Sequence, residues 1–188
     1  EMFNVMLDTI NFASNVPYAT STGSKSYRAQ KYNLTVAAAS QPSRIIFRQE
    51  IFLRNNRSYT AFLGADSTNR QLVLFTTEDD MTSLGADKAK FRVIDFSQGS
   101  KANTTPLGID VYSDTLPRFF RGLTFPSITA FAPIFGDSNY VMNFRWVDSS
   151  KVLKSFPLAT ETGKVYSLVT TGYPLDSARF HILLVKHN

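Results

Sequence analysis

Cysteine is absent from this chain of 188 residues, and charged residues make up only 19 % of it. The lack of cysteine excludes disulfides, thiol nucleophiles and cysteine-ligated zinc sites. Long apolar runs are missing too, because residues 122–136 are uncharged but contain two prolines and fall short of the ~20 residues of a membrane-spanning helix. We therefore expect no membrane span. The apolar content of 43 % is that of a folded chain and not of a disordered one.

Histidine is scarce, and its two copies, His181 and His187, are six residues apart. On one extended strand this spacing separates them by about 20 Å, so they cannot bind one metal ion together. A serine hydrolase would need one of them beside a serine on a Gly-x-Ser-x-Gly turn, and the sequence has no such turn. We predict no catalytic residue, no metal site and no bound cofactor, and we expect that the protein is not an enzyme.

Aromatic residues are abundant, with 16 Phe, 8 Tyr and 1 Trp, and apolar residues recur at a period of two. From Tyr140 to Trp146 every second side chain is large and apolar, while Asn143 and Arg145 fall on the opposite face. Such alternation is typical of half-buried β-strands. The other predicted strands are bounded by Asn, Asp, Gly, Pro or Ser. They are residues 3–7, 32–38, 45–53, 58–64, 71–76, 91–96, 108–112, 127–132, 152–158, 165–171 and 179–186.

The second half of the chain repeats the first with a shift of about 106 residues. Residues 3–10 align with 109–116, and the apolar row in residues 32–38 aligns with the row in residues 140–146. A repeat of this length is a whole domain, since solenoids and propellers repeat every ~20–50 residues. We predict a first β-sandwich over residues 1–77, a linker over residues 78–89 and a second β-sandwich over residues 90–188.

The second copy begins with a strand that has no counterpart in the first. Residues 90–97 precede residues 109–112, but nothing precedes the matching residues 3–6. We therefore expect that the N-terminal strand of the first sandwich belongs to a segment missing from this chain. The short alternating strands predict an all-β protein of two tandem antiparallel β-sandwiches, Ig-like or transthyretin-like, and periodicity does not separate these two arrangements.

Three segments carry a family resemblance: Phe-Arg-Val at 91–93, Ile-Asp-Val-Tyr at 109–112 and Gly-Lys-Val-Tyr-Ser-Leu-Val at 163–169, with Gly172 closing the last strand. This pattern resembles the domain-of-unknown-function family 4397, over nearly all of the second copy and more faintly over the first. The resemblance implies tandem Ig-like domains on a secreted or lipid-anchored bacterial protein, commonly of Bacteroidetes. It places the chain in the periplasm, on the outer membrane or at the cell surface, with the anchor upstream of Glu1. It supplies no catalytic residue.

Carboxylate chemistry is the catalytic chemistry that the composition leaves open, because a glycosidase needs only two acids ~5–9 Å apart. Most aspartates here neighbour Ser, Asn, Thr, Gly or Pro, where they cap turns. Asp110 differs, since it lies between two apolar residues of a predicted strand. We expect it to pair with an arginine such as Arg92 across the sheet. A carbohydrate hydrolase that uses a carboxylate pair is the alternative function.

Residues 117–126 suit a role beyond the scaffold. Phe119 and Phe120 are consecutive, so only one of them is expected to face the core of an extended chain. They lie between Arg118 and Arg121, and arginine and aromatic residues are enriched at interface hot spots and stacking sites. We predict that these four residues are the candidate interaction site, with packing between domains or loops as the competing interpretation.

These features predict a non-enzymatic cell-envelope protein that acts in adhesion, glycan binding or assembly, with a glycan or an envelope protein as its partner. Nucleic acid is the weaker alternative. Residues 25–57 hold seven basic residues and one acidic residue, but the basic residues alternate with apolar ones and no RNA-reading motif accompanies them.

Overall fold

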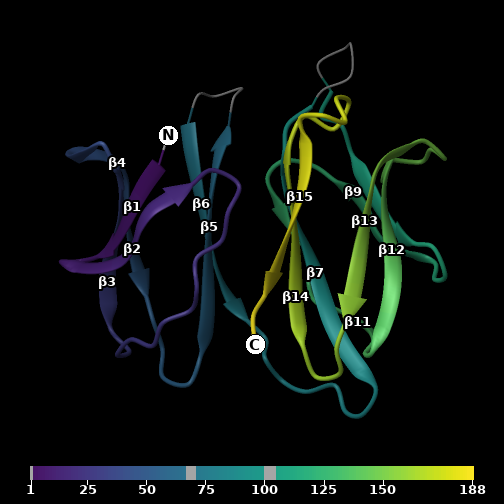
Figure 1. Cartoon of the computed structure of the whole chain (residues 1–188), viewed down its shortest axis with the longest axis horizontal. Coiled ribbons are helices and arrows are strands. Elements are labelled where there is room, and N and C mark those ends of the chain that lie inside the picture. Colours follow the sequence, from purple (N-terminus) through teal and green to yellow (C-terminus); the bar gives the residue numbers. More distant parts are fainter. Residues whose placement is uncertain (1, 67–70, 100–104) are drawn as a thin grey trace. The chain divides into compact units, whose positions relative to one another are not determined.

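The computed structural model describes residues 2–66, 71–99 and 105–188 (Figure 1). Within these ranges the chain forms strands and no helix, so the predicted all-β class is confirmed, and no helix there could cross a membrane. The strands belong to two compact units, unit 1 (Glu1–Asp80) and unit 2 (Met81–Asn188). Among the described strand pairs, one in unit 2 is parallel and the others are antiparallel.

Unit 1 contains a four-stranded sheet in the order β2-β1-β3-β4 and a separate pair, β5 with β6. Its strands are β1 (Met2–Leu7), β2 (Ile10–Pro17), β3 (Lys31–Ala38), β4 (Gln41–Phe52), β5 (Ser58–Asp66) and β6 (Gln71–Asp79). Asp8 follows β1 with a φ of 51°, a left-handed conformation that aspartate tolerates in turns. Its carboxylate accepts a hydrogen bond from the amide of Asn33 at 2.9 Å, which joins the turn to β3.

Unit 2 contains two sheets. One has the order β13-β12-β8-β9, and the other has the order β10-β7-β14-β15, with β11 also paired to β7. β7 and β14 form the parallel pair. The strands are β7 (Lys88–Ser97), β8 (Ile109–Ser113), β9 (Arg118–Leu123), β10 (Ser127–Ile128), β11 (Ala132–Phe135), β12 (Ser138–Trp146), β13 (Val152–Thr160), β14 (Val165–Gly172) and β15 (Phe180–Lys186).

Alternation decides which side chains form the core of unit 2. In β12, Tyr140, Met142 and Phe144 are buried whereas Val141 is exposed, as the period of two predicts. Phe91 of β7 lies in the same core, so side chains of both sheets meet there. The other buried members are Ala89, Val93, Leu107, Ile109, Val111, Ile134, Leu153, Leu158, Tyr166, Leu168 and Phe180.

The core of unit 1 is smaller. Its buried members are Leu7, Tyr32, Leu34, Val36 and Ile51. All of them come from the four-stranded sheet, and Leu74 of β6 packs against them while remaining partly exposed. The pair β5 and β6 therefore covers this core only in part.

The four-stranded sheets of the two units follow the same plan. When strands are matched by the shift of about 106 residues, β1, β2, β3 and β4 correspond to β8, β9, β12 and β13. The order β2-β1-β3-β4 then becomes β9-β8-β12-β13, which is the order in unit 2. Registers match as well, since Val5 pairs with Val36 in unit 1 and Val111 pairs with Phe144 in unit 2. The duplication stays a prediction, and this shared pairing is the pattern that it predicts.

Some strands and boundaries differ from expectation. β2, β9 and β11 lack a clear alternation in the sequence, and it is pairing with a neighbouring strand that makes them extended. The predicted linker over residues 78–89 is narrower in the structure. β6 continues to Asp79, which pairs with Ser58, and β7 already begins at Lys88.

Candidate functional site

The four predicted interaction residues lie on β9, at the edge of its sheet. The register between β8 and β9 is shifted there, because Val111 pairs with Phe120 while the next residue, Tyr112, pairs with Arg118. Phe119 is thus the extra residue of a β-bulge, which turns its side chain toward the side that Phe120 occupies. The expectation that only one of the two phenylalanines faces the core is therefore wrong.

Both phenylalanines pack on the same core residue. The ring centroids of Phe119 and Phe120 lie 4.9 and 5.5 Å from that of Phe91, and both contacts are edge-to-face. Each side chain is half-buried. Such aromatic contacts hold β9 against β7 of the other sheet.

The two arginines of β9 are held by two aspartates. Arg118 Nη1 lies 3.2 Å from Oδ2 of Asp110, which is fully buried, and 3.8 Å from Oδ1 of Asp148. Arg121 Nη2 donates to both carboxylate oxygens of Asp148 at 2.9 Å, and this hydrogen bond raises the pKa of the Arg121 guanidinium above its ordinary value. The prediction that Asp110 pairs with an arginine across the sheet is confirmed, but the partner is Arg118 and not Arg92, because β8 pairs with β9.

Asp110 also fixes the backbone at the end of β9. Its Oδ1 accepts the amide of Gly122 at 2.8 Å, and Gly122 has a φ of 63°. Unit 1 has the matching contact: the amide of Asn15, with a φ of 54°, donates to Asn4 Oδ1 at 3.0 Å. An acid in unit 2 and an amide in unit 1 thus perform the same backbone role, and only the acid binds an arginine as well.

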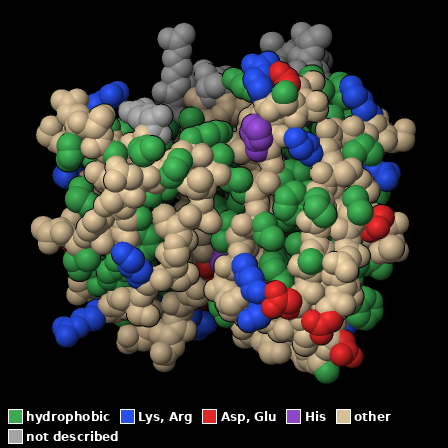
Figure 2. Space-filling view, in the orientation of Figure 1, with side chains coloured by type: hydrophobic (Ala, Val, Ile, Leu, Met, Phe, Trp, Pro, Cys, Tyr) green, Lys and Arg blue, Asp and Glu red, His purple; other side chains and the backbone are tan. Residues whose placement is uncertain are grey.

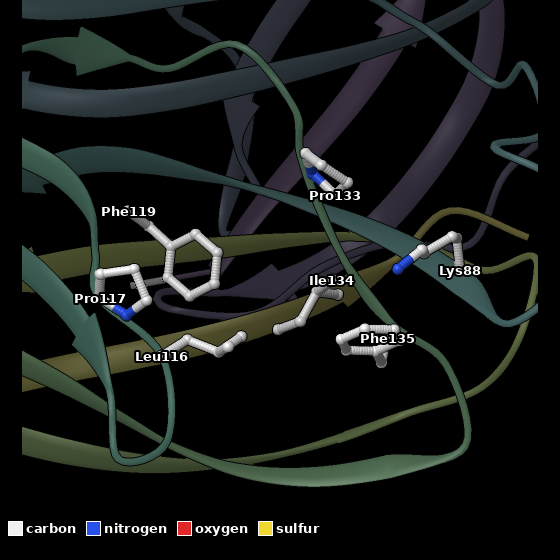
Figure 3. Close-up of a pocket in the computed structure, with 7 residues that line it drawn as sticks. All are labelled: Lys88, Leu116, Pro117, Phe119, Pro133, Ile134 and Phe135. Atoms are coloured by element: carbon white, nitrogen blue, oxygen red, sulfur yellow. The ribbon is translucent and has the colours of Figure 1, made fainter.

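An apolar pocket lies beside β9, with a volume of about 320 Å³. Figure 3 shows Pro117 and Phe119 on one side of it and Phe135 with Lys88 on the other. Lys88 Nζ lies 3.4 Å from the centroid of the Phe135 ring, a cation–π contact at the rim. The lining residues are Lys88, Leu116, Pro117, Phe119, Pro133, Ile134 and Phe135.

Pairing between distant segments builds this pocket. β11 pairs with the start of β7, with Ile134 opposite Ala89 and Phe135 opposite Lys88. Of the predicted interaction residues, Phe119 lines the pocket, whereas Phe120 packs in the core and the two arginines are ion-paired nearby. Sequence reasoning missed Lys88 and Phe135. The apolar residues before Phe135 were the available signal for a strand there, but they do not indicate that this strand pairs with β7.

Two other polar clusters lie in unit 2. Ser167 Oγ contacts His187 Nε2 at 2.7 Å and accepts a hydrogen bond from Arg92 Nε at 2.8 Å. This resembles a serine–histidine pair, but Ser167 is completely buried, so no substrate reaches its hydroxyl in this structure. Asp110 and Asp148 are two acids that converge on Arg118, and the Asp110 carboxylate already accepts three hydrogen bonds. Neither arrangement leads us to propose a hydrolase.

The second polar cluster, apart from the one around Ser167, surrounds Asp95 of β7. Its Oδ1 accepts hydrogen bonds from Ser97 and Thr170, while Oδ2 is buried without a partner in the described part of the chain. Burial raises the pKa of Asp95 above 3.8, and the hydrogen bonds from Ser97 and Thr170 oppose that rise. Ser127, whose Oγ is also buried without a partner there, pairs with Asp95 in the ladder. Residues 2–66, 71–99 and 105–188 contain no cluster of three metal-ligating side chains.

The basic stretch over residues 25–57 forms no single patch. Lys31 pairs with Glu50 at 3.0 Å, Arg57 pairs with Glu78 at 3.3 Å, and Lys25 Nζ donates to the carbonyl of Phe12. On the face that Figure 2 shows, lysine and arginine side chains are scattered. Local contacts of this kind give no continuous track for a phosphate backbone.

Comparison with known proteins finds one family. A model of the domain of unknown function DUF4397 matches residues 1–103, which cover unit 1 and continue through β7. The match therefore lies mainly on the first copy, where the sequence pattern had placed the fainter part of the resemblance. No curated protein matches the sequence.

Proposed function

We propose that this chain, which belongs to the DUF4397 family, is a non-enzymatic binding module of a bacterial cell envelope and takes part in protein assembly. The pocket beside β9 is the observation that carries this proposal. The envelope location, in the periplasm or at the cell surface, and the tandem Ig-like architecture rest on the family resemblance described above.

The lining of the pocket favours a polypeptide over a glycan. Among the lining residues, Lys88 has the one polar side chain, so hydroxyl groups of a sugar would lose water without finding hydrogen-bond partners. An apolar side chain forms no hydrogen bonds with water, so it gives up none when it enters the pocket. The volume of about 320 Å³ lies at the lower end of the ~300–1,000 Å³ of small-molecule sites, which suits a single large apolar side chain of a partner protein.

The rim adds a charge preference. Lys88 lies over Phe135, whose side chain is 49 % exposed, so an acidic residue next to the apolar anchor would meet the ammonium group. The wall opposite is held in place by the bulge and by the Arg118–Asp110 pair. A preformed wall lowers the ordering cost of binding. The partner is therefore an extended or loop segment with a bulky apolar residue beside Asp or Glu.

Selection of peptides from a random library on the full chain tests the proposal. Enriched peptides should share an apolar residue next to an acid, and Phe135→Ala should weaken their binding at least about tenfold, the effect of a hot-spot residue. Lys88→Glu should weaken it further for acidic peptides. Leu184→Ala, an exposed apolar residue of β15, is the matched control.

Two results would overturn the proposal. One is a set of selected peptides that bind the Phe135→Ala and Leu184→Ala variants equally well. The other is a glycan array on the full chain that identifies ligands whose binding depends on Phe135. We expect the array to show no such ligand.

A further inference from the structure

The β13-β12-β8-β9 sheet of unit 2 has an outer face, which is the face turned away from the core. Phe144 of β12 is buried in the core, so its neighbours Asn143 and Arg145 lie on the outer face. Asn143 is paired with Tyr112 of β8. Arg145 is paired with Asp110 of the same strand. These four outer residues lie apart from the pocket beside β9, because none of them lines it.

Arg145 is an arginine of this face without an acidic partner. Asp110, which lies opposite it, is paired with Arg118 at 3.2 Å. Asp148 binds Arg121 with both carboxylate oxygens. Within residues 2–66, 71–99 and 105–188, no hydrogen bond or ion pair reaches the Arg145 guanidinium. Its Nε is buried, whereas Nη1 and Nη2 reach the surface. Arg145 therefore offers a positive charge and two surface nitrogens that the described protein groups do not use.

The ring of Tyr112 holds this guanidinium in place. Arg145 Cζ lies 4.4 Å from the ring centroid, a cation–π contact. Tyr112 is half-buried, and its strand lies between β12 and β9, so the ring is a fixed support. An arginine that is already positioned loses less side-chain entropy when it binds. Its planar fork matches a carboxylate through two parallel hydrogen bonds. The stack thus prepares Arg145 for a carboxylate ligand.

The matching sheet of unit 1 has no such stack. By the register that the two sheets share, Ala37 corresponds to Arg145 and Met6 corresponds to Tyr112. The same strand order therefore forms with alanine and methionine at these two positions. The fold does not require the arginine–tyrosine pair, which favours a binding role for it in unit 2.

Polar groups beside Arg145 suit the hydroxyl groups of a sugar. Asn143 Oδ1 accepts a hydrogen bond from Ser155 Oγ at 2.7 Å, which orients the amide. Asn143 Nδ2 makes a long contact of 3.4 Å with the carbonyl of Val141, so its second hydrogen can bind a ligand. The Tyr112 hydroxyl reaches the surface and has no hydrogen bond among the described residues. Such groups can replace the water that sugar hydroxyls lose on binding.

We propose that this outer face binds a uronic acid unit of an acidic polysaccharide. Because Nε is buried, the carboxylate approaches the end of the fork and accepts hydrogen bonds from the two Nη atoms of Arg145. The ring hydroxyls of the sugar bind Tyr112 and Asn143. An acidic peptide would supply the carboxylate without neighbouring hydroxyl groups, so the glycan uses more of the polar groups on this face.

Calorimetric titration of the full chain with tetramers of galacturonic, mannuronic and guluronic acid tests the proposal. At least one tetramer should bind, and its methyl ester, which keeps the hydroxyls and loses the charge, should bind at least tenfold more weakly. Arg145→Gln should weaken binding of the acid at least tenfold. Arg145→Lys keeps the charge without the fork and should restore binding only in part.

Arg54→Gln is the matched control. Arg54 is an exposed arginine of unit 1 that makes no hydrogen bond or ion pair within the described ranges, so its loss changes the net charge equally. Tyr112→Leu removes the ring under Arg145 and should weaken binding about threefold. Far-ultraviolet circular dichroism checks that each variant folds. The comparison of acid and ester on the unaltered chain needs no variant, so a folding defect does not remove the test.

Four outcomes would overturn this inference. The first is that no acid tetramer binds more tightly than about 1 mM. The second is equal affinity for the acid and its methyl ester. The third is an equal loss in Arg145→Gln and Arg54→Gln, which would indicate unspecific attraction. The fourth is a tetraglutamate peptide that binds as tightly and depends on Arg145, which would assign the face to an acidic polypeptide. Phe135→Ala should leave the binding of the tetramers unchanged, so failure here is distinguishable from failure of the pocket proposal.

Discussion

Unit 1 and unit 2 arrange matching strands in the same order, but they bury them to different extents. In unit 2, β14 lies between β7 and β15, and all of it except Gly172 is buried. In unit 1, β5 pairs with β6, and Phe62 is its one buried residue. A strand does more than complete a hydrogen-bonded ladder, because its side chains also cover the inward row of its neighbour. Among the described strands, β7 beside β14 is thus one feature that distinguishes the larger core of unit 2 from the smaller core of unit 1.

The two units also differ in how they hold the second strand of the shared sheet. Asn4 in unit 1 and Asp110 in unit 2 each accept the amide of a residue with positive φ. Asp110 is buried and ion-paired with Arg118, whereas the contact of Asn4 is exposed. The same backbone turn thus has a stronger electrostatic anchor in the unit with the larger core.

The largest expected effect comes from β7, the strand that pairs with β14 in unit 2 and that has no counterpart beside β5 among the described strands. Phe91→Ala should lower the free energy of unfolding of unit 2 by about 3–5 kcal/mol, because it leaves a cavity and removes two edge-to-face contacts. Trp146, the single tryptophan of the chain, lies in unit 2, so its fluorescence during urea unfolding measures this loss.

A matched variant in unit 1 makes this a comparison of the units. Leu34→Ala removes a buried side chain from the smaller core and should leave the midpoint reported by Trp146 where it is. If Leu34→Ala shifted that midpoint as much as Phe91→Ala, the two units would unfold as one, and the contrast drawn above would not hold.

A smaller effect is expected at the shared backbone anchor. Asp110→Ala should destabilise unit 2 by about 2 kcal/mol, because the amide of Gly122 and the guanidinium of Arg118 both lose a buried acceptor. Asn4→Ala should cost unit 1 only about 0.5–1 kcal/mol, since water can replace the exposed contact. Urea unfolding measures the first, and hydrogen exchange of residues 2–17 measures the second. Equal costs would contradict the difference in anchoring.

The smallest effect is a pH dependence confined to unit 2. The pKa of Asp95 is raised in the folded protein by burial, so the folded state holds this proton more tightly than the unfolded state. Its contribution to stability is complete below pH 3.8 and is lost as pH rises through the folded pKa. Asp95→Asn keeps the oxygen that accepts from Ser97 and Thr170 and cannot ionise.

Asp95→Asn should therefore stabilise unit 2 at pH 8 by on the order of 1 kcal/mol relative to the parent chain, and by less at pH 4. The measurement is the urea midpoint of Trp146 fluorescence at both pH values. A stabilisation that is the same at pH 4 and pH 8 would show that ionisation of Asp95 is not the cause.

Strands with regular alternation could be predicted from the sequence, as β12 shows, because every second residue from Tyr140 to Trp146 is large and apolar. β9 could not be predicted. Phe119 and Phe120 break the period of two, and only the bulge formed against β8 allows both to reach Phe91. Prediction of the candidate site had the same limit. The composition of residues 117–126 predicts an interaction site, whereas in the structure the two arginines of this segment bind Asp110 and Asp148.

By itself the sequence determined the all-β class, the core-facing rows of the regular strands and the absence of cysteine chemistry, because these depend on residue type and on spacing along one strand. Only the tertiary structure decided the partner of Asp110, the pocket between β9 and β11, and the different surroundings of β5 and β14. Those features depend on which strands become neighbours, and segments far apart in the chain meet through packing that no local pattern encodes.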